Sequence, residues 1–410
     1  MSRPTVLPSR AGAAGTGGAL FTRLLPLAVA MFAVGTDGFV IAGLLPEIAA
    51  DLDVGVPAAG QLVTVFALAF AVSAPVLGAL TSALDRRTAL LLALAVFTVG
   101  NAATALGLDY RTVLAARIVT ATGAGLIGAA AFSAATALAP AQRRGRALAF
   151  VMGGLTLAIA FGLPAGTLIG GADWRITLWA VAGLGVVAAS GVAVALPRIP
   201  LPPDRLRARL EPLRRPWVFA MLGVTTLTLA GTHLLYTYIS PALEGATAGS
   251  VTSLTVVLLA WGVGNMIGNT LAGRLADRYP PWWVVSAGLA AATLLLCVGP
   301  AVVGSLGTAT VWAVLWGVCV SLPVVPQQSR FVAYAPGAAA VLLGLNSSAI
   351  YLGVALGGAL GGLLQDQLTP ARLGFAAAGV SLAALLLNVG TVRRGRGRGR
   401  GRGQGRGRGR

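Results

Sequence analysis

The sequence of 410 residues is poor in the side chains that keep a protein in water. Only 10% of its residues are charged, whereas a soluble domain carries about 25%. Lysine is absent, and the 12 acidic residues are outnumbered by 30 arginines. With 56% hydrophobic residues and a mean hydropathy of +0.83, the composition excludes a water-soluble fold.

These shortages also exclude several kinds of chemistry. Without lysine the chain cannot form the phosphate-binding loop G-x-x-x-x-G-K-[ST], so ATP-driven transport by this chain alone is excluded. The single histidine and the few acids form no cluster suited to a catalytic metal, and no G-x-S-x-G elbow occurs. Cys297 and Cys319 lie in apolar runs, where we expect packing roles rather than a disulfide. We expect no enzyme, no metal and no cofactor.

Long apolar stretches, separated by charged or Pro/Gly-rich breaks, make up most of the chain. Most are close to the roughly 20 residues that cross a bilayer as a helix. They lie at about 24–46, 58–80, 88–107, 111–135, 145–170, 176–196, 217–239, 249–272, 283–303, 307–326, 338–363 and 372–391. The predicted fold class is an all-α polytopic membrane protein, with 12 transmembrane helices arranged as two six-helix repeats.

Arginine placement predicts the orientation, because short cytoplasmic loops retain positive charge and external loops do not. With the N-terminus inside, 26 of the 30 arginines are cytoplasmic, while Arg111, Arg175 and Arg372 are external and Arg117 lies within a span. We therefore expect both termini in the cytoplasm of a cell whose plasma membrane the chain crosses many times. The expected parts are a cytoplasmic N-terminal segment (1–23), an N-terminal six-helix half (24–196), a cytoplasmic linker (197–216), a C-terminal six-helix half (217–391) and a disordered Arg-Gly cytoplasmic tail (392–410).

The sequence of the Arg-Gly tail is compatible with more than one kind of partner. Its nine arginines repel one another and its glycines add flexibility, which predicts disorder. It is suited to anionic lipids of the inner leaflet, at about 1 kcal/mol per arginine, or to nonspecific RNA binding. The alternative is a low-complexity extension without a function. No specific nucleic acid is expected.

Two short loops carry matching motifs in the two halves. Residues 78–87 end in Asp85-Arg86-Arg87, and residues 273–278 read Gly273-Arg-Leu-Ala-Asp277-Arg278. These loops and the six-plus-six spans resemble the major facilitator superfamily. Residues 35–46, GTDGFVIAGLLP, resemble the first helix of its drug:proton antiporter group, which contains arabinose-efflux-like and chloramphenicol-resistance exporters. The resemblance covers about residues 24–391. It implies gating roles for both loops, but Ser82 and Asp85 depart from the pattern, so the charge-relay role is expected at Asp277.

Two charged residues fall in the middle of predicted spans. Asp37 is the only mid-span carboxylate, and a carboxylate in hydrocarbon costs at least about 2.5 to 3.5 kcal/mol. We expect it to face a cavity or partner and to take up protons, or else to be capped by a hydroxyl such as that of Thr36. Arg117 resembles the arginine of the family's fourth-helix motif. It is suited to pairing with Asp37 or binding an anionic substrate, unless it reaches the external face.

The fifth span is rich in glycine. Its Gly162-x-Pro164-x-Gly166-x-x-x-Gly170 spacing resembles the antiporter motif of exporters, although Leu163 separates the expected Gly-Pro pair. Glycines at four-residue spacing allow close helix approach, and proline bends the span. We expect these residues to form a rocking interface between the halves.

Scattered polar residues in or near the spans are candidates for a mostly apolar substrate cavity with a few orienting groups. His233 is either a second titrating group or a satisfied polar residue. The candidates are Gln61, Thr64, His233, Tyr236, Asn265, Asn346 and Tyr351, with further amides at Asn269, Gln327 and Gln328.

The predicted function is a proton-coupled exporter of small, largely apolar or amphipathic compounds of the drug or antibiotic type, working by alternating access. An importer or a sugar or metabolite permease of the same fold is the alternative, although a sugar importer should have more mid-span acids, amides and tryptophans. A non-transporting receptor is a further alternative, but it would not need Asp37. The expected partners are a small-molecule substrate, protons and the lipid bilayer, and the chain is expected to act as a monomer.

Overall fold

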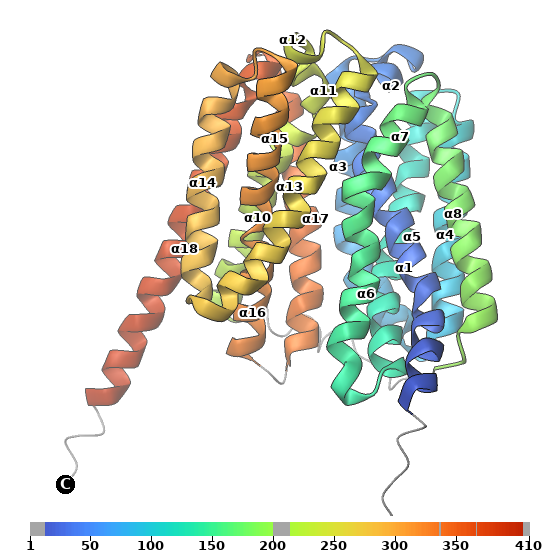
Figure 1. The fold of residues 1–410 in the computed structure, drawn as a ribbon, viewed down its shortest axis with the longest axis vertical. Coiled ribbons are helices and arrows are strands. Elements are labelled where there is room, and N and C mark those ends of the chain that lie inside the picture. The colour runs from blue at the N-terminus through green and yellow to red at the C-terminus, as the bar shows by residue number, and fades with distance from the viewer. Residues whose placement is uncertain (1–12, 200–213, 336–337, 366, 405–410) are drawn as a thin grey trace, which may run out of the picture.

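The structure is a computed structural model that describes residues 13–199, 214–335, 338–365 and 367–404. Twelve of its helices are long and apolar enough to cross a membrane, as predicted. They stand side by side in a bundle of two halves (Figure 1). The helices of the N-terminal half are α1 (Ala13–Gly43), α3 (Val56–Leu80), α4 (Arg86–Leu106), α5 (Tyr110–Leu138), the run α6 (Arg144–Leu157), η4 (Ala158–Gly162) and α7 (Leu163–Gly170), and α8 (Trp174–Ala195).

The C-terminal half repeats this order. Its helices are α10 (Pro216–Tyr236), α13 (Val251–Arg278), α14 (Pro281–Val302), the pair α15 (Leu306–Ser321) and α16 (Val324–Tyr334), α17 (Ala339–Leu364) and α18 (Leu373–Gln404). The short helices α2 (Leu45–Asp51), α11 (Ile239–Ala242) and α12 (Glu244–Thr247) lie at the top of Figure 1. We call this the upper end, and the opposite end, where α1 begins, the lower end.

Helix packing within each half follows one plan. In the N-terminal half α4 packs on α5 and α8, while α1 packs on α6 and α8. In the C-terminal half α14 packs on α15 and α18, while α10 packs on α17 and α18. Equivalent helices therefore make equivalent contacts, which confirms the two six-helix repeats.

Contacts between the halves also come as an equivalent pair. The second span of each half, α3 or α13, packs on the fifth span of the other half, which is α17 for α3 and the run η4–α7 for α13. At the upper end α11 adds contacts to α1 and α2. The site described below lies along these contacts.

Side chains at the helix starts account for several of the loop acids. Asp85, Asp109 and Asp173 are the N-cap residues of α4, α5 and α8, and each accepts a backbone N–H of the first turn. Such caps satisfy N–H groups that have no partner inside the helix. These three carboxylates therefore have a local structural role.

The fifth span contains a π-helical turn at η4, directly before Leu163 and Pro164. Proline has no backbone N–H, so the carbonyl one turn earlier, at Ala160, loses its ordinary helical donor. A π turn accommodates this break and widens the helix locally. The wide turn lies at the contact with α13.

The structure can be compared with the predicted N-terminal segment, the linker and the tail. Helix α1 begins at Ala13, so it includes residues 13–23 of the predicted N-terminal segment. Most of the linker, at 200–213, lies outside the described residues. Helix α18 runs to Gln404, so the expected disorder is wrong for 392–404, because adding residues to an existing helix is easier than starting one. Residues 405–410 lie outside the described part.

Candidate transport site between the two halves

A buried ion pair joins the first and fourth spans. Arg117 Nη1 donates to Asp37 Oδ1 over 2.6 Å, and both side chains have no exposed surface. Arg117 Nη2 lies 3.4 Å from the carbonyl oxygen of Asp37. The structure therefore brings together the two charged residues found within spans, and Arg117 does not reach the external face.

The pair leaves part of its bonding capacity unused. Asp37 Oδ2 and Arg117 Nε are buried, and neither has a hydrogen-bond partner within the described chain. The hydroxyl of Thr36 is also buried and makes no bond there, so the alternative of a Thr36 cap on Asp37 is wrong. Buried polar atoms normally have partners, so each unpaired atom needs an explanation. A free carboxylate oxygen is a place where a proton can bind.

A series of aromatic contacts leads from this pair to the other half. The guanidinium of Arg117 lies 4.2 Å from the ring centre of Phe66. Phe66 contacts Phe70 at 6.4 Å between ring centres, and Phe70 stacks on Tyr351 at 3.5 Å. Phe70 belongs to α3 and Tyr351 to α17, so this stack crosses between the halves.

A second group of rings, which we call the aromatic cluster, surrounds Tyr236. Phe39 of α1 lies 5.9 Å from Tyr236 and 6.0 Å from His233, so the cluster also spans both halves. Tyr236 lies 4.5 Å from Trp261, which is 5.9 Å from Trp316. The members of the cluster are Phe39, His233, Tyr236, Trp261, Trp312 and Trp316.

Sequence reasoning missed the tryptophans of this cluster. The expectation that few tryptophans lie mid-span is wrong, because Trp261, Trp312 and Trp316 are buried inside α13 and α15. Their helices are apolar on most sides, so the pattern of apolar residues does not reveal which face meets the other half. The count of tryptophans within predicted spans was the one available signal.

His233 is nearly buried beside Phe39 and Tyr236. Its Nδ1 lies 3.1 Å from the carbonyl oxygen of Leu229, one turn earlier in its own helix. This local bond favours the alternative of a satisfied polar residue over a second titrating group.

The predicted cavity residues Gln61 and Thr64 lie on the α3–α17 contact towards the upper end. A Cβ at Gly362 would be 2.6 Å from Gln61 Nε2, and one at Gly358 would be 2.7 Å from Thr64 Oγ1. Gln61 donates to its own helix at Pro57 O, over 3.3 Å. Both residues therefore belong to a tight contact in which α3 and α17 approach closely because α17 has glycine there.

Gly162, Gly166 and Gly170 of the fifth span face the first span of the same half, not the other half. A Cβ at Gly162 would meet Thr36 at 2.2 Å, and Cβ atoms at Gly166 and Gly170 would meet Val40 and Leu44 at 2.6 and 2.7 Å. Their expected place at a rocking interface is corrected accordingly. Glycine spacing indicates a close-packing face, but it does not say which helix packs there.

The surface that meets the other half is the π turn itself. A Cβ at Gly262 of α13 would lie 2.7 Å from both Ala160 Cα and Ile159 O of η4. This is a backbone-to-backbone approach, which only glycine permits at Gly262. Pro164 lies buried in α7, directly after this turn.

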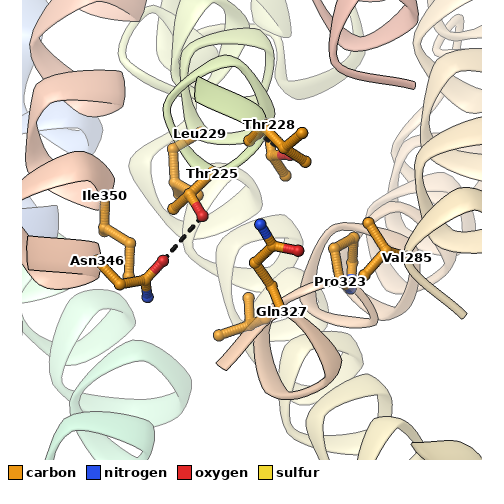
Figure 2. A pocket seen from close by; sticks show the side chains of 10 residues that line it. Thr225, Thr228, Leu229, Val285, Pro323, Gln327, Asn346 and Ile350 are labelled. Atoms are coloured by element: carbon orange, nitrogen blue, oxygen red, sulfur yellow. Dashed lines mark hydrogen bonds between the residues drawn. The ribbon is translucent and has the colours of Figure 1, made fainter. Parts of the chain in front are cut away.

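A small pocket lies inside the C-terminal half, between α10, α14, α16 and α17 (Figure 2). Thr225 donates to Asn346 Oδ1 over 2.8 Å, and Gln327 points towards the same space. Gln327 Nε2 donates to Met221 O, while its Oε1 accepts from Arg330. Asn346, one of the amide candidates, lines this pocket, whereas Asn265 is half-buried on α13 and lines none of the described pockets.

The gating loops lie at the lower end. Hydrogen bonds from the Thr88 side chain lower the pKa of Asp85, which supports its capping role. The backbone N–H of Arg86 donates to Ile199 O over 3.0 Å. Gly273 has open space around its Cα, and Asp277 and Arg278 are exposed. Within the described residues Asp277 forms no ion pair, so its charge-relay role stays a prediction.

Comparison with known proteins agrees with this architecture. The family model described as Major Facilitator Superfamily matches residues 27–336. The chain is 37% identical over 346 residues to the inner membrane transport protein YdhP of Escherichia coli (strain K12), covering 83% of this chain and 87% of that protein. It is 37% identical over 270 residues to a chloramphenicol resistance protein of Streptomyces lividans, covering 64% of this chain and 68% of that protein.

A solved structure with the same fold is a bacterial homologue of the human lysosomal transporter Spinster, in an inward-facing and occupied conformation. The TM-score is 0.73 at 17% identity, and the match covers 90% of this chain and 96% of that chain. Identity this low supports the fold alone. With the family model, the relatives and the repeated six-helix packing in agreement, this multi-pass membrane protein belongs to the major facilitator superfamily of transporters.

Proposed function

We propose that the chain is a proton-coupled exporter of small, largely apolar or amphipathic compounds. The observation that carries the proposal is the Asp37–Arg117 pair, which has no exposed surface and, within the described residues, is bonded through one carboxylate oxygen. An ionisable group in the membrane interior is costly and marks a pathway for ions or substrate. The similarity to a chloramphenicol resistance protein supports export of an antibiotic-type compound.

The distribution of arginines supports an orientation with the lower end and both termini in the cytoplasm. Contacts between the halves include the upper part of the bundle, and along α3 they extend from Gln61 to Phe70. Towards the upper end, Cβ positions at Gly43, Gly171 and Gly262 would meet Leu258, Val251 and Ala160 of the opposite half. Further down α13, Gly264 and Gly268 face α15 of their own half. In this orientation, these contacts support a state that is closed to the outside.

Alternating access then assigns a role to each member of the pair. In the closed-outside state Asp37 and Arg117 are paired, and a compound enters from the cytoplasm. After the compound leaves on the external side, a proton binds Asp37 Oδ2 and removes the charge that attracts Arg117. The arginine is then free to shift against Phe66, and the Phe66–Phe70–Tyr351 contacts carry that shift to the other half. Release of the proton to the cytoplasm restores the pair.

The test is Asp37→Asn, which imitates the protonated carboxyl at nearly constant volume and keeps an oxygen that Arg117 can bond. A screen of toxic compounds, chloramphenicol first, in a host stripped of its own efflux pumps would identify a substrate. In proteoliposomes with an imposed pH difference, Asp37→Asn should lose accumulation against a gradient but still bind the compound. The matched control is Glu244→Gln, an exposed carboxylate in α12. Uphill transport by Asp37→Asn at the wild-type rate would place the proton site elsewhere.

A sugar or metabolite permease is the second candidate, and the buried tryptophans of the aromatic cluster favour it more than the sequence did. The two candidates differ in substrate and in direction. If the protein concentrates a sugar inside vesicles and confers no resistance to any toxic compound, the permease is the better assignment.

A further inference from the structure

The aromatic cluster contains hydrogen-bond donors that have no acceptor. Tyr236 Oη, Trp261 Nε1 and Trp316 Nε1 are buried, and no acceptor for them exists among the described residues. The three side chains are at most 3% exposed. An unpaired buried donor costs about 1 to 3 kcal/mol, so three in one contiguous cluster indicate a bonding partner that the chain itself does not supply.

Two comparable side chains, Trp312 within the cluster and Tyr238 beside it, have hydrogen-bond acceptors for the same polar groups. Tyr238 Oη donates to Gly358 O over 2.9 Å, and Trp312 Nε1 donates to Leu295 O over 2.8 Å. Burial of a tyrosine or tryptophan in this region therefore does not by itself leave the donor unpaired. The unpaired set belongs to the cluster that meets Phe39 across the two halves.

The charges around the cluster define the compounds that it can accept. The cluster contributes donors and ring edges, which carry partial positive charge. In the span segments that the structure describes, the acids are Asp37, which is already paired with Arg117, and Asp277, which is exposed at the lower end. A positively charged compound would have no carboxylate to compensate it there. The ring faces that could attract a cation are packed against one another or, for Phe66, covered by Arg117.

We propose that Tyr236, Trp261 and Trp316 form the specificity site of the transporter, where an uncharged aromatic or amphipathic compound places a hydrogen-bond acceptor, and that permanent cations are excluded. The site rests on the proposed transport function and names its substrate class. Because the cluster joins α1 to α10 across the two halves, movement of the halves rearranges its contacts and exposes the donors to the compound.

The test measures binding and stability separately from transport. Purified full-length protein is heated with or without a compound, and the midpoint of unfolding is recorded. One probe is chloramphenicol, an uncharged aromatic compound with nitro and amide acceptors. The other is tetraphenylphosphonium, a permanent aromatic cation. Chloramphenicol should raise the midpoint by mass action, and tetraphenylphosphonium should not. Stabilisation by the cation alone would indicate cation–π binding and overturn the proposal, as would no stabilisation by chloramphenicol.

Isosteric variants decide whether the donors matter. Tyr236→Phe removes only an unpaired hydroxyl, so the free protein should keep or raise its midpoint while its affinity for chloramphenicol falls by about 2- to 12-fold. Tyr238→Phe is the matched control, which loses a paired hydroxyl and should lower the midpoint. If Tyr236→Phe lowers the midpoint of the free protein and leaves its affinity for chloramphenicol unchanged, the Tyr236 hydroxyl has a partner within the protein. The assignment of the specificity site is then wrong.

The tryptophans allow the same comparison at equal loss of volume. Trp316→Phe should weaken chloramphenicol binding more than Trp312→Phe, and Trp312→Phe should destabilise the free protein more, because it breaks an existing bond. The reverse order would overturn the assignment. None of these measurements uses a proton gradient, so a failed Asp37→Asn test would refute the coupling and leave this result standing.

Discussion

Arg117 binds one oxygen of the Asp37 carboxylate, and the other oxygen is buried without a partner among the residues that the structure describes. The pair is therefore neutral as a whole but incompletely bonded. This combination allows the carboxylate to remain in the membrane while a proton can still bind it. The free energy with which Asp37 and Arg117 stabilise one another can be measured directly.

The first prediction concerns the pair as a unit. Asp37→Ala or Arg117→Ala should destabilise the protein by about 3 to 5 kcal/mol, because each strands a buried charge. The double variant should recover much of this loss, since no uncompensated charge remains. The midpoint of thermal unfolding of all four proteins gives the double-mutant cycle. Additive losses would show that the two charges do not stabilise one another.

The second prediction concerns the contact between α13 and the π turn. Gly262→Ala introduces a methyl group at 2.7 Å from the backbone at Ala160, and the halves must move apart there. Overpacking of this kind costs about 1 to 3 kcal/mol. We expect the population to shift towards a state open at the upper end. A cysteine at Thr64, in a protein with Cys297 and Cys319 replaced by alanine, should react faster with an external reagent.

The control for this shift is Gly153→Ala, in the same span as the π turn. No atom lies within 4 Å of a Cβ at Gly153, so this change should leave the cysteine's reactivity as it was. Equal reactivity in both glycine variants would mean that the α13 contact does not hold the upper end closed.

The third prediction concerns pH. Glu47 lies half-buried in α2 at the upper end, and burial raises its pKa. A carboxyl whose pKa is higher in the folded state stabilises the protein at low pH and loses that contribution as pH rises from about 4.5 through its folded pKa. Glu47→Gln should remove this fall in stability and raise the midpoint at neutral pH. A variant with the same pH profile as wild type would contradict the assignment.

The fourth prediction concerns topology. Reporter fusions at position 205 and at the C-terminus should be active only as cytoplasmic reporters, because 26 arginines then lie inside. Activity of a reporter that works only outside the cytoplasm, at either point, would reverse the assignment of the upper end.

The fold was predictable because its signals are strong and local. Each span is a long apolar run, and the matching loops around Asp85 and Asp277 mark the repeat. Asp37 and Arg117 were recognisable for the same reason, since a charge within a span is rare and needs a partner. Their bond to one another was one of several open alternatives.

The remaining parts of the site depend on which neighbouring helix each helix face packs against, and a sequence pattern does not contain this information. The spacing of Gly162, Gly166 and Gly170 predicts a close contact but does not distinguish α1 from the opposite half. Trp261 and Trp316 lie in helices that are apolar nearly all round, so no polar stripe marks their inner face. Whether a buried donor has an acceptor depends on several helices at once.

The π turn of the fifth span holds one residue more than an α-helical turn would need. If that residue were returned to α-helical geometry, the helix beyond it would advance by about 1.5 Å and rotate by roughly 100°. The surface formed by Ile159 and Ala160 would then turn away from Gly262, and a different row of side chains would meet α13. The fifth span therefore contains one extra residue that allows its register to change by one position. This residue lies where the two halves are in contact.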